Sequence, residues 1–338
     1  MTQTNKRINS PDSLEADARP IRLAIAGFGN QGQEHFQACS ANPELANVVA
    51  VCDPAKVEGN LQNGIRCYRS LDDLFKLESI DAIIVATPPI HYKKVVTEAA
   101  KFQLPILLEK PLGLNLQEAG DLIDICDQNN SPLLLAAQRR FHPSFLRVSE
   151  LLRDMAEVKS AELELMIAVQ KNVTAQNTGQ DWRCSVGAML DLGFHAIDLG
   201  RLWFGELQLV SANVFDDRRQ ICRNRIDTEA HLLFKTEAGT LFRIRIGRTL
   251  HKSERLTVHG DRGTLIANRG AVHRILNNEE FCESTCDPDW CVAMQAQLRE
   301  LQKVCLGTAC QSTTTLSSIQ GLITMQLIEE AYDRSEYA

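Results

Sequence analysis

The chain has 338 residues, of which 44% are hydrophobic and 23% are charged, and its formal net charge is -7. These values are typical of globular proteins, and the length fits two domains of ordinary size. They exclude wholesale disorder, and no apolar run reaches the roughly 18 residues that a membrane span needs. Because the chain has no basic run, nucleic acid is excluded as a partner, and we expect a small-molecule ligand.

Residues 1–20 are polar and lack the apolar centre of a secretory signal. We therefore expect a flexible lead-in and a protein that stays in the cytoplasm. The chain has 11 cysteines, an odd number, and several take the place of small apolar residues in predicted elements, which favours reduced thiols. The spacing of Cys282, Cys286 and Cys291 matches no zinc pattern, so we expect no metal.

Short apolar runs alternate with helical stretches over residues 21–139, which is typical of a parallel sheet with crossover helices. The runs are apolar at nearly every position, as strands covered on both faces should be. We predict a doubly wound α/β domain here, with Asn115 capping its last helix. The predicted strands are Ile21–Ala26, Val48–Cys52, Ala82–Ala86, Ile106–Leu108 and Leu133–Ala137, and the predicted helices are Gln33–Cys39, Leu71–Phe75, His91–Phe102 and Leu116–Asn129.

The first strand leads directly into a glycine-rich segment that reads A-G-F-G-N-Q-G. We expect Gly27 to turn the chain, Gly29 to leave room for phosphates, and Gly32 to let the next helix pack close to the strand. The N–H groups at the helix start would face the negative charge of a dinucleotide. The predicted cofactor contacts in this loop also include Phe28, Asn30 and Gln31.

Asp53 follows the second predicted strand, about 20 residues after the last of these glycines, where a carboxylate can accept hydrogen bonds from the adenosine ribose. The alternative is a glycine-rich turn beside a capping Asp. Asp53 favours NAD over NADP, since its charge would repel a 2′-phosphate and Pro54 and Ala55 offer no Arg to bind one. Lys56 leaves NADP open.

Two further segments end predicted parallel strands, at the edge where open α/β sheets bind ligands. In L-E-K-P, Lys110 can donate a hydrogen bond to a substrate oxygen and stabilise negative charge on it, the alternative being a solvated Lys before a proline turn. In A-T-P-P-I-H, the prolines force an extended turn across the same edge, the alternative being a rigid loop before a helix. We add Thr87, Pro88, His91 and Glu109 to the cofactor-binding candidates.

The pattern changes after about residue 140 to a helix followed by strands that turn-rich segments separate. Over residues 140–338 we predict an α+β domain with an open, largely antiparallel mixed sheet and helices on one face. Apolar and basic side chains alternate in residues 241–246, which indicates that the strand has one apolar and one basic face. The face of the sheet that no helix covers can bury surface area against another subunit. The predicted strands are Ser160–Val169, Val210–Phe215, His231–Phe234, Leu241–Gly247, Arg255–Val258 and Thr264–Ala267, and the predicted closing helices are Cys291–Cys305 and Leu316–Tyr332.

Met189–Phe204 is predicted to be a largely buried helix with one polar stripe, formed by Asp191, His195 and Asp198 at positions i, i+4 and i+7. Three buried titratable groups need partners or a cavity, because desolvation of unpaired charges is costly. We expect Asp198 to pair with Arg201 or with backbone donors. We expect the other two to face a cavity, where a carboxylate can hold a His in the correct state for proton transfer.

Together, A-G-F-G-N-Q-G, A-T-P-P-I-H, L-E-K-P and D-L-G-F-H-A-I-D resemble the Gfo/Idh/MocA family, the glucose-fructose oxidoreductase and inositol dehydrogenase group, over about residues 20 to 335. The resemblance implies a Rossmann domain, an α+β domain with an open mixed sheet, a nicotinamide cofactor, and a homodimer or homotetramer built through that sheet. It places the family's catalytic residues on Lys110, Asp191 and His195. It adds Gln138, Trp182 and Arg183 to the cofactor-binding candidates.

The activity that this resemblance implies is reversible oxidation of a secondary alcohol on a sugar, inositol or related polyol. Ser185-Val186-Gly187 departs from the glycine run that many members carry before the catalytic helix, which changes the substrate loop. Residues 257–266 are also reminiscent of the family's biliverdin reductase branch, which lacks the Lys, Asp and His set. A second alternative is a dinucleotide-sensing regulatory protein without turnover, which would have no need of a proton-transfer group.

Overall fold

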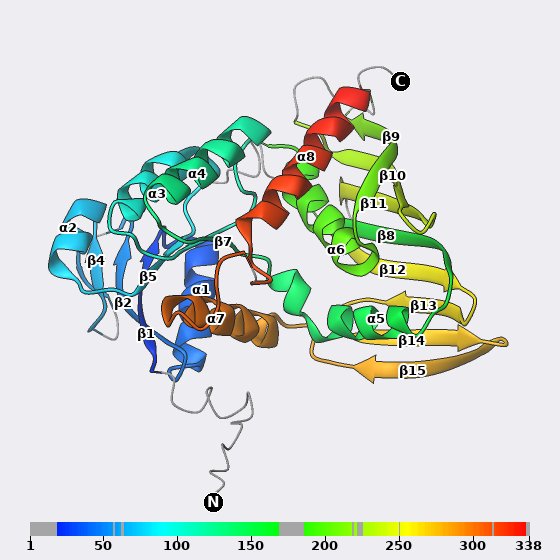
Figure 1. Ribbon diagram of the computed structural model, residues 1–338, viewed down its shortest axis with the longest axis horizontal. Coiled ribbons are helices and arrows are strands. Elements are labelled where there is room, and N and C mark those ends of the chain that lie inside the picture. The colour runs from blue at the N-terminus through cyan, green and yellow to red at the C-terminus, as the bar shows by residue number, and fades with distance from the viewer. Residues whose placement is uncertain are drawn as a thin grey trace, which may run out of the picture.

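The computed structural model describes residues 19–56, 58–61, 64–168, 186–217, 220–221, 226–249, 251–312 and 314–335. In this part of the chain, two lobes lie side by side, each built on one β-sheet (Figure 1). Helix α8, Ser318–Ser335, lies between the lobes and packs against elements of both. None of the described helices is long and apolar enough to cross a membrane.

The first sheet contains six parallel strands in the order β4-β2-β1-β5-β6-β7, with the short antiparallel strand β3 at one edge of its described part. This is the strand order of a doubly wound dinucleotide-binding fold, so the predicted Rossmann architecture is confirmed. The strands are β1 Ile21–Ala26, β2 Ala46–Cys52, β3 Gly59–Asn60, β4 Arg66–Tyr68, β5 Ala82–Val85, β6 Ile106–Leu108 and β7 Leu133–Leu135.

Helices cover both faces of this sheet because its strands are apolar on both sides. Ile83 and Val85 of β5 pack on one face with α3 and α4, whereas Ile84 faces the core that contains α1. Helix α7 comes from the end of the chain and packs beside α1, through residues that include Leu298 and Leu301. The helices are α1 Asn30–Ala41, α2 Leu71–Leu77, α3 Tyr92–Ala100, α4 Leu116–Gln128 and α7 Cys291–Cys305, of which α7 has the predicted bounds.

The second sheet has eight strands in the described residues, in the order β15-β14-β13-β12-β8-β11-β10-β9. Strands β8 and β11 run parallel, and the other neighbours pair antiparallel, which confirms the predicted mixed sheet. The strands are β8 Val158–Ala168, β9 Leu207–Phe215, β10 Glu229–Thr236, β11 Leu241–Thr249, β12 Ser253–Gly260, β13 Gly263–Ala267, β14 Ala271–Leu276 and β15 Glu279–Thr285.

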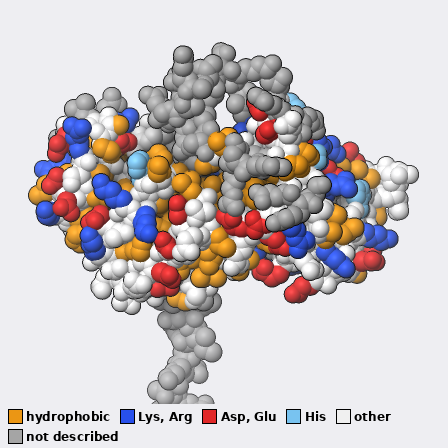
Figure 2. Space-filling model, turned by 90° about the horizontal axis from the view of Figure 1, so that it is seen from above, with side chains coloured by type: hydrophobic (Ala, Val, Ile, Leu, Met, Phe, Trp, Pro, Cys, Tyr) orange, Lys and Arg blue, Asp and Glu red, His pale blue; other side chains and the backbone are white. Residues whose placement is uncertain are grey.

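The two faces of the second sheet differ as the alternation in β11 predicts. Phe242 and Ile244 are fully buried beneath the helices. On the opposite face, Arg245 lies 3.1 Å from Glu164 of β8, so this surface carries both charges and is not simply basic. On the face that Figure 2 shows, Lys and Arg side chains are likewise interspersed with Asp and Glu over both lobes.

Four of the described strands were not predicted, namely β3, β4, β14 and β15. β4 has three residues and begins with the charged Arg66, so it offers no apolar run, and β15 is an exposed strand at the sheet edge. The predicted N-cap of α4 is confirmed, since the Glu118 N–H donates to Asn115 Oδ1 at 2.9 Å.

The predicted buried helix over Met189–Phe204 begins with a π-helical turn, Met189–Gly193, before the α-helix α6, Phe194–Phe204. The Phe194 N–H donates to the carbonyl of Met189, five residues earlier. A wide turn of this kind is rare and occurs frequently at functional sites, because it changes the direction of a side chain on the helix.

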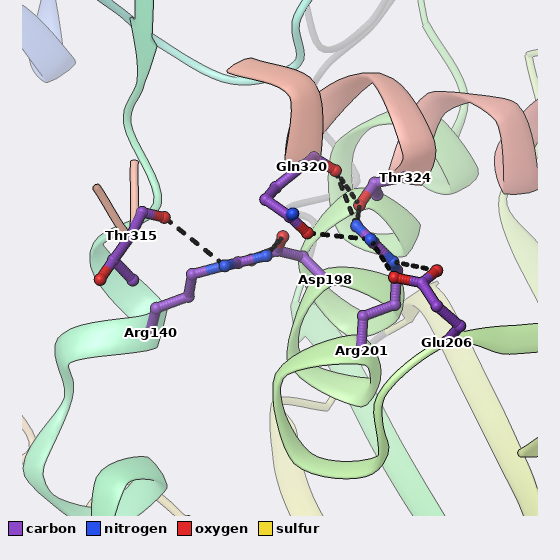
Figure 3. Close-up of polar contacts among 7 residues, drawn as sticks. All are labelled: Arg140, Asp198, Arg201, Glu206, Thr315, Gln320 and Thr324. Atoms are coloured by element: carbon purple, nitrogen blue, oxygen red, sulfur yellow. Dashed lines mark hydrogen bonds and ion pairs between the residues drawn. The ribbon is translucent and has the colours of Figure 1, made fainter. Parts of the chain in front are cut away.

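The expectation that Asp198 pairs with Arg201 is wrong. Asp198 accepts two hydrogen bonds from Arg140, at 2.8 and 2.6 Å, and Arg201 instead binds Glu206 and Gln320 (Figure 3). The reason is that Arg140 enters from the 3₁₀ turn Gln138–Phe141, which packs against α6, whereas Arg201 points toward α8. Both members of the Arg140–Asp198 pair are buried.

We predict that Asp198→Ala destabilises the protein by about 3 to 5 kcal/mol, because it leaves the buried Arg140 guanidinium without its counter-charge. The matched control is Glu206→Ala, which we expect to cost clearly less than Asp198→Ala, because Glu206 is exposed and Arg201 keeps its bonds to Gln320. Urea unfolding followed by circular dichroism measures both variants. Equal losses would show that the buried Arg140 guanidinium does not depend on the Asp198 charge.

Candidate active site

The candidate site lies at the carboxyl edge of the parallel strands, where the chain leaves each strand. Gly27 follows β1, Asp53 follows β2 and Thr87 follows β5. Glu109 comes directly after β6, and Gln138 follows β7. Parallel strands bring these segments to one edge of the sheet, so the first lobe gathers these cofactor candidates as the sequence predicts.

The three glycines of the loop have different surroundings. Gly27 has a φ of 88°, and a Cβ there would lie 2.7 Å from the backbone of Ala86, so a side chain fits neither the conformation nor the space. A Cβ on Gly32 would overlap the carbonyl oxygen of Gly27. A Cβ on Gly29 would meet nothing within 4 Å. Gly27 and Gly32 are thus required by packing, whereas Gly29 faces open space at the start of α1.

Asp53 is held beside this loop by backbone hydrogen bonds. Its Oδ2 accepts the Phe28 N–H at 2.8 Å, and its Oδ1 accepts the Ala55 N–H at 2.9 Å. A carboxylate oxygen has two lone pairs, so each oxygen retains one for a further donor. The carboxylate both orients the glycine loop and offers acceptors at the strand edge.

Two buried polar atoms at this edge fit a bound group. Thr87 Oγ1 and Gln138 Oε1 are buried, and neither has a hydrogen-bond partner among the described residues. Buried polar atoms are rarely left unpaired, and a ligand is one explanation. Together with the open space at Gly29, these atoms fit a dinucleotide that lies along the strand ends. Of the other A-T-P-P-I-H candidates, Pro88 directly precedes the 3₁₀ turn Pro89–His91, and His91 is exposed at the end of that turn.

The central contact of the site joins the two lobes. Lys110 follows β6 of the first sheet, and its Nζ lies 2.7 Å from Asp191 Oδ1 and 3.2 Å from the Asp191 carbonyl oxygen. Asp191 lies in the π-helical turn of the second lobe. Both side chains are buried, with exposed fractions of 8% and 4%. The structure therefore brings together two of the three predicted catalytic residues.

The third, His195, lies in the first turn of α6, four positions after Asp191, and is 8% exposed. It follows the π-helical turn that carries Asp191 on the same buried helix. The other expected contributors, Trp182 and Arg183, lie outside the described residues.

Arg248 is a site residue that the sequence analysis missed. It lies in β11 and contacts Asp191 Oδ2 at 3.2 Å and the Val186 carbonyl at 3.0 Å. Asp191 therefore has a cationic partner on each oxygen. The sequence does contain a signal for Arg248. The alternation in β11 puts it on the same face as Phe242 and Ile244, and a lone cation on an apolar face needs a partner.

Asp227 was also missed, and it anchors the start of the π-helical turn. Its Oδ2 accepts the Met189 N–H at 2.8 Å, and its Oδ1 accepts the Tyr332 hydroxyl at 2.6 Å. Burial raises the pKa of the Asp227 carboxyl, while these hydrogen bonds act in the opposite direction. Asp227 thus fixes the first residue of the turn, while Lys110 and Arg248 fix the Asp191 carboxylate.

Two family models match the chain. The oxidoreductase family with an NAD-binding Rossmann fold, GFO_IDH_MocA, matches residues 21–136, and the GFO/IDH/MocA C-terminal domain matches residues 158–266. The rhizopine catabolism protein MocA of Rhizobium meliloti is 31% identical over 188 residues, which cover 55% of this chain and 58% of that relative. Inositol 2-dehydrogenase of Rhizobium meliloti (strain 1021) is 26% identical over 73% of this chain and 75% of that enzyme.

Solved structures share the fold over nearly the whole chain. The aldose-aldose oxidoreductase from Caulobacter crescentus, complexed with glycerol, has a TM-score of 0.80 at 18% identity and covers 94% of this chain and 98% of its own. An oxidoreductase from Agrobacterium radiobacter, in complex with NAD+, L-tartaric acid and magnesium, has a TM-score of 0.77 at 18% identity, with coverage of 94% and 96%. With family models matching both sheets in the order found here, the chain belongs to the Gfo/Idh/MocA family of oxidoreductases.

Proposed function

We propose that the protein is an NAD-dependent dehydrogenase that reversibly oxidises a secondary alcohol of a sugar, inositol or related polyol. The observation that carries this proposal is the contact of Lys110 with Asp191, which puts a buried ammonium at the carboxyl edge of a dinucleotide-binding sheet. The relative that acts on inositol supports the substrate class. We also propose that copies of the chain assemble through the outer face of the second sheet.

His195, Lys110 and Asp191 have different roles in the proposed reaction. A bound nicotinamide would supply the hydride chemistry, by which the alcohol carbon loses a hydride and the ketone regains it. His195 takes the hydroxyl proton as a general base and gives it back in the reverse direction. Lys110 donates a hydrogen bond to the same oxygen and stabilises its developing negative charge. Asp191 accepts from Lys110 and Arg248 on separate oxygens, so it positions the ammonium and is not the base.

The cofactor proposal rests on the loop and on the strand ends. The N–H groups at the start of α1 would bind the pyrophosphate, and the open space at Gly29 would admit it. Asp53 accepts from the adenosine ribose and repels a 2′-phosphate, which favours NAD over NADP. Thr87 and Gln138 would supply buried polar atoms for hydrogen bonds to the rest of the dinucleotide.

The test of this proposal is a screen of polyols, sugars and nucleotide sugars that follows absorbance of the reduced cofactor, with NAD and NADP in parallel. Turnover of a polyol or sugar with NAD supports the proposal. Tight binding of NAD without turnover of any of these compounds would instead favour a dinucleotide sensor. Turnover of a linear tetrapyrrole alone would favour a biliverdin-reductase-like enzyme.

On a substrate found in this way, we predict that His195→Ala lowers kcat by about a hundredfold to ten-thousandfold, the usual contribution of general acid–base catalysis. Cofactor affinity persists, because His195 is not one of the proposed cofactor contacts. The control is His231→Ala, a partly exposed residue that pairs with Glu229 on the outer face of the second sheet, and it leaves kcat unchanged. A wild-type kcat in His195→Ala would remove this residue from the mechanism.

We further predict opposite effects for alanine at two glycines of the loop. Gly29→Ala keeps the unfolding temperature of the free protein, because its Cβ meets no atom, but it weakens NAD binding at least tenfold, by more than about 1.4 kcal/mol. Gly32→Ala lowers the unfolding temperature itself, because its Cβ overlaps the Gly27 carbonyl. Calorimetric titration and thermal unfolding separate the two. Unchanged NAD affinity in Gly29→Ala would rule out this loop as the pyrophosphate site.

A further inference from the structure

A buried histidine connects the two parts of the proposed cofactor site. His35 lies on α1, one turn after Gly32, on the face that also carries Cys39. Its ring Nε2 lies 2.7 Å from Oε1 of Glu109, and the two side chains are only 1% and 6% exposed. The residues are separated by 74 positions in sequence, so the contact joins the helix of the glycine loop to the end of β6.

The Glu109 carboxylate has a second contact, on the side of the proposed catalytic lysine. Its Oε2 accepts the backbone N–H of Lys110 at 3.2 Å. The backbone of Glu109 is itself fixed, because its N–H donates to the Val85 carbonyl of β5 at 2.9 Å. One carboxylate thus binds α1 through one oxygen and the backbone of Lys110 through the other.

The contacts of the His35 ring indicate which of its two nitrogens carries the hydrogen. Nδ1 of His35 is buried and has no hydrogen-bond partner among the described residues. A protonated ring would bury an Nδ1–H donor without an acceptor, which is costly. A neutral ring with its hydrogen on Nε2 leaves only an unpaired acceptor and donates to Glu109. This tautomer is therefore the one that the contacts favour.

We propose that His35 is a positioning residue that, through Glu109, couples cofactor binding at the start of α1 to the placement of Lys110. Pyrophosphate binding acts on the N-terminus of α1, and the buried His35–Glu109 contact transmits the position of that helix to the turn that carries Lys110. The inference rests on the proposed dehydrogenase function. It adds to that function a physical link between the two subsites.

Two substitutions separate the hydrogen bond from the packing. His35→Leu fills the space but removes the donor, whereas His35→Gln keeps a donor nitrogen near the position of Nε2. We expect His35→Leu to lower kcat at saturating NAD by about tenfold to a hundredfold, the cost of a small misplacement of a catalytic group, and to weaken NAD binding by calorimetric titration. We expect His35→Gln to recover most of both losses.

The matched control is Cys39→Ala, on the same buried face of α1 one turn later. It lowers the unfolding temperature by removing buried volume, but it leaves kcat and NAD affinity unchanged. If His35→Leu behaves like this control, or if His35→Gln is no better than His35→Leu, the residue is only structural and the proposal is overturned.

A measurement on the unsubstituted protein does not depend on turnover. Nitrogen-15 NMR of the histidine rings, with His35 assigned from its loss in His35→Gln, is expected to show a neutral ring protonated on Nε2. A ring protonated on Nδ1 alone would overturn the proposal even if His35→Leu fails to fold. If the protein binds NAD but oxidises no substrate, the proposed function fails while the NAD titrations still test the coupling.

Discussion

The arrangement of the site depends on one buried contact, the ion pair between Lys110 and Asp191. Each partner comes from a different lobe, and the buried Lys110 ammonium has its counter-charge in Asp191, whose other oxygen binds Arg248. Such a pair adds little net stability, because desolvation of both groups offsets much of their attraction. Its effect is on geometry, since the buried ammonium is held at the edge where the strands of the first sheet end.

A second connection runs beside the first and holds the lobes in one relative position. Arg139 follows β7 and pairs with Glu254 of β12, which also binds Arg269 at 2.8 Å. Both guanidinium groups lie over the Trp290 ring, at 5.1 and 4.7 Å from its centroid. Burial, together with the charge of Arg269, lowers the pKa of Arg139 to about 9. With the Arg140–Asp198 pair, this cluster explains how the π-helical turn is kept opposite the end of β6.

Features set by short-range backbone demands were predictable from the sequence, and features set by distant partners were not. Gly27 is required by its φ and Gly32 by close packing, and such positions are recognisable as a glycine motif in the sequence. The apolar runs likewise predicted nearly every long strand. The partner of Asp198 lies 58 positions away, so local spacing wrongly favoured Arg201. His35 and Arg248 each stand alone on an apolar face, which signals a partner without identifying it.

The most direct test of this account is a crystal structure of the protein with NAD bound. The account predicts that the nicotinamide ring lies over the ends of β5 and β6. Lys110 and His195 are both directed toward its C4 atom, with room for the alcohol carbon and hydroxyl of the substrate between them and C4. A ring bound elsewhere, or either side chain turned away from C4, would contradict it.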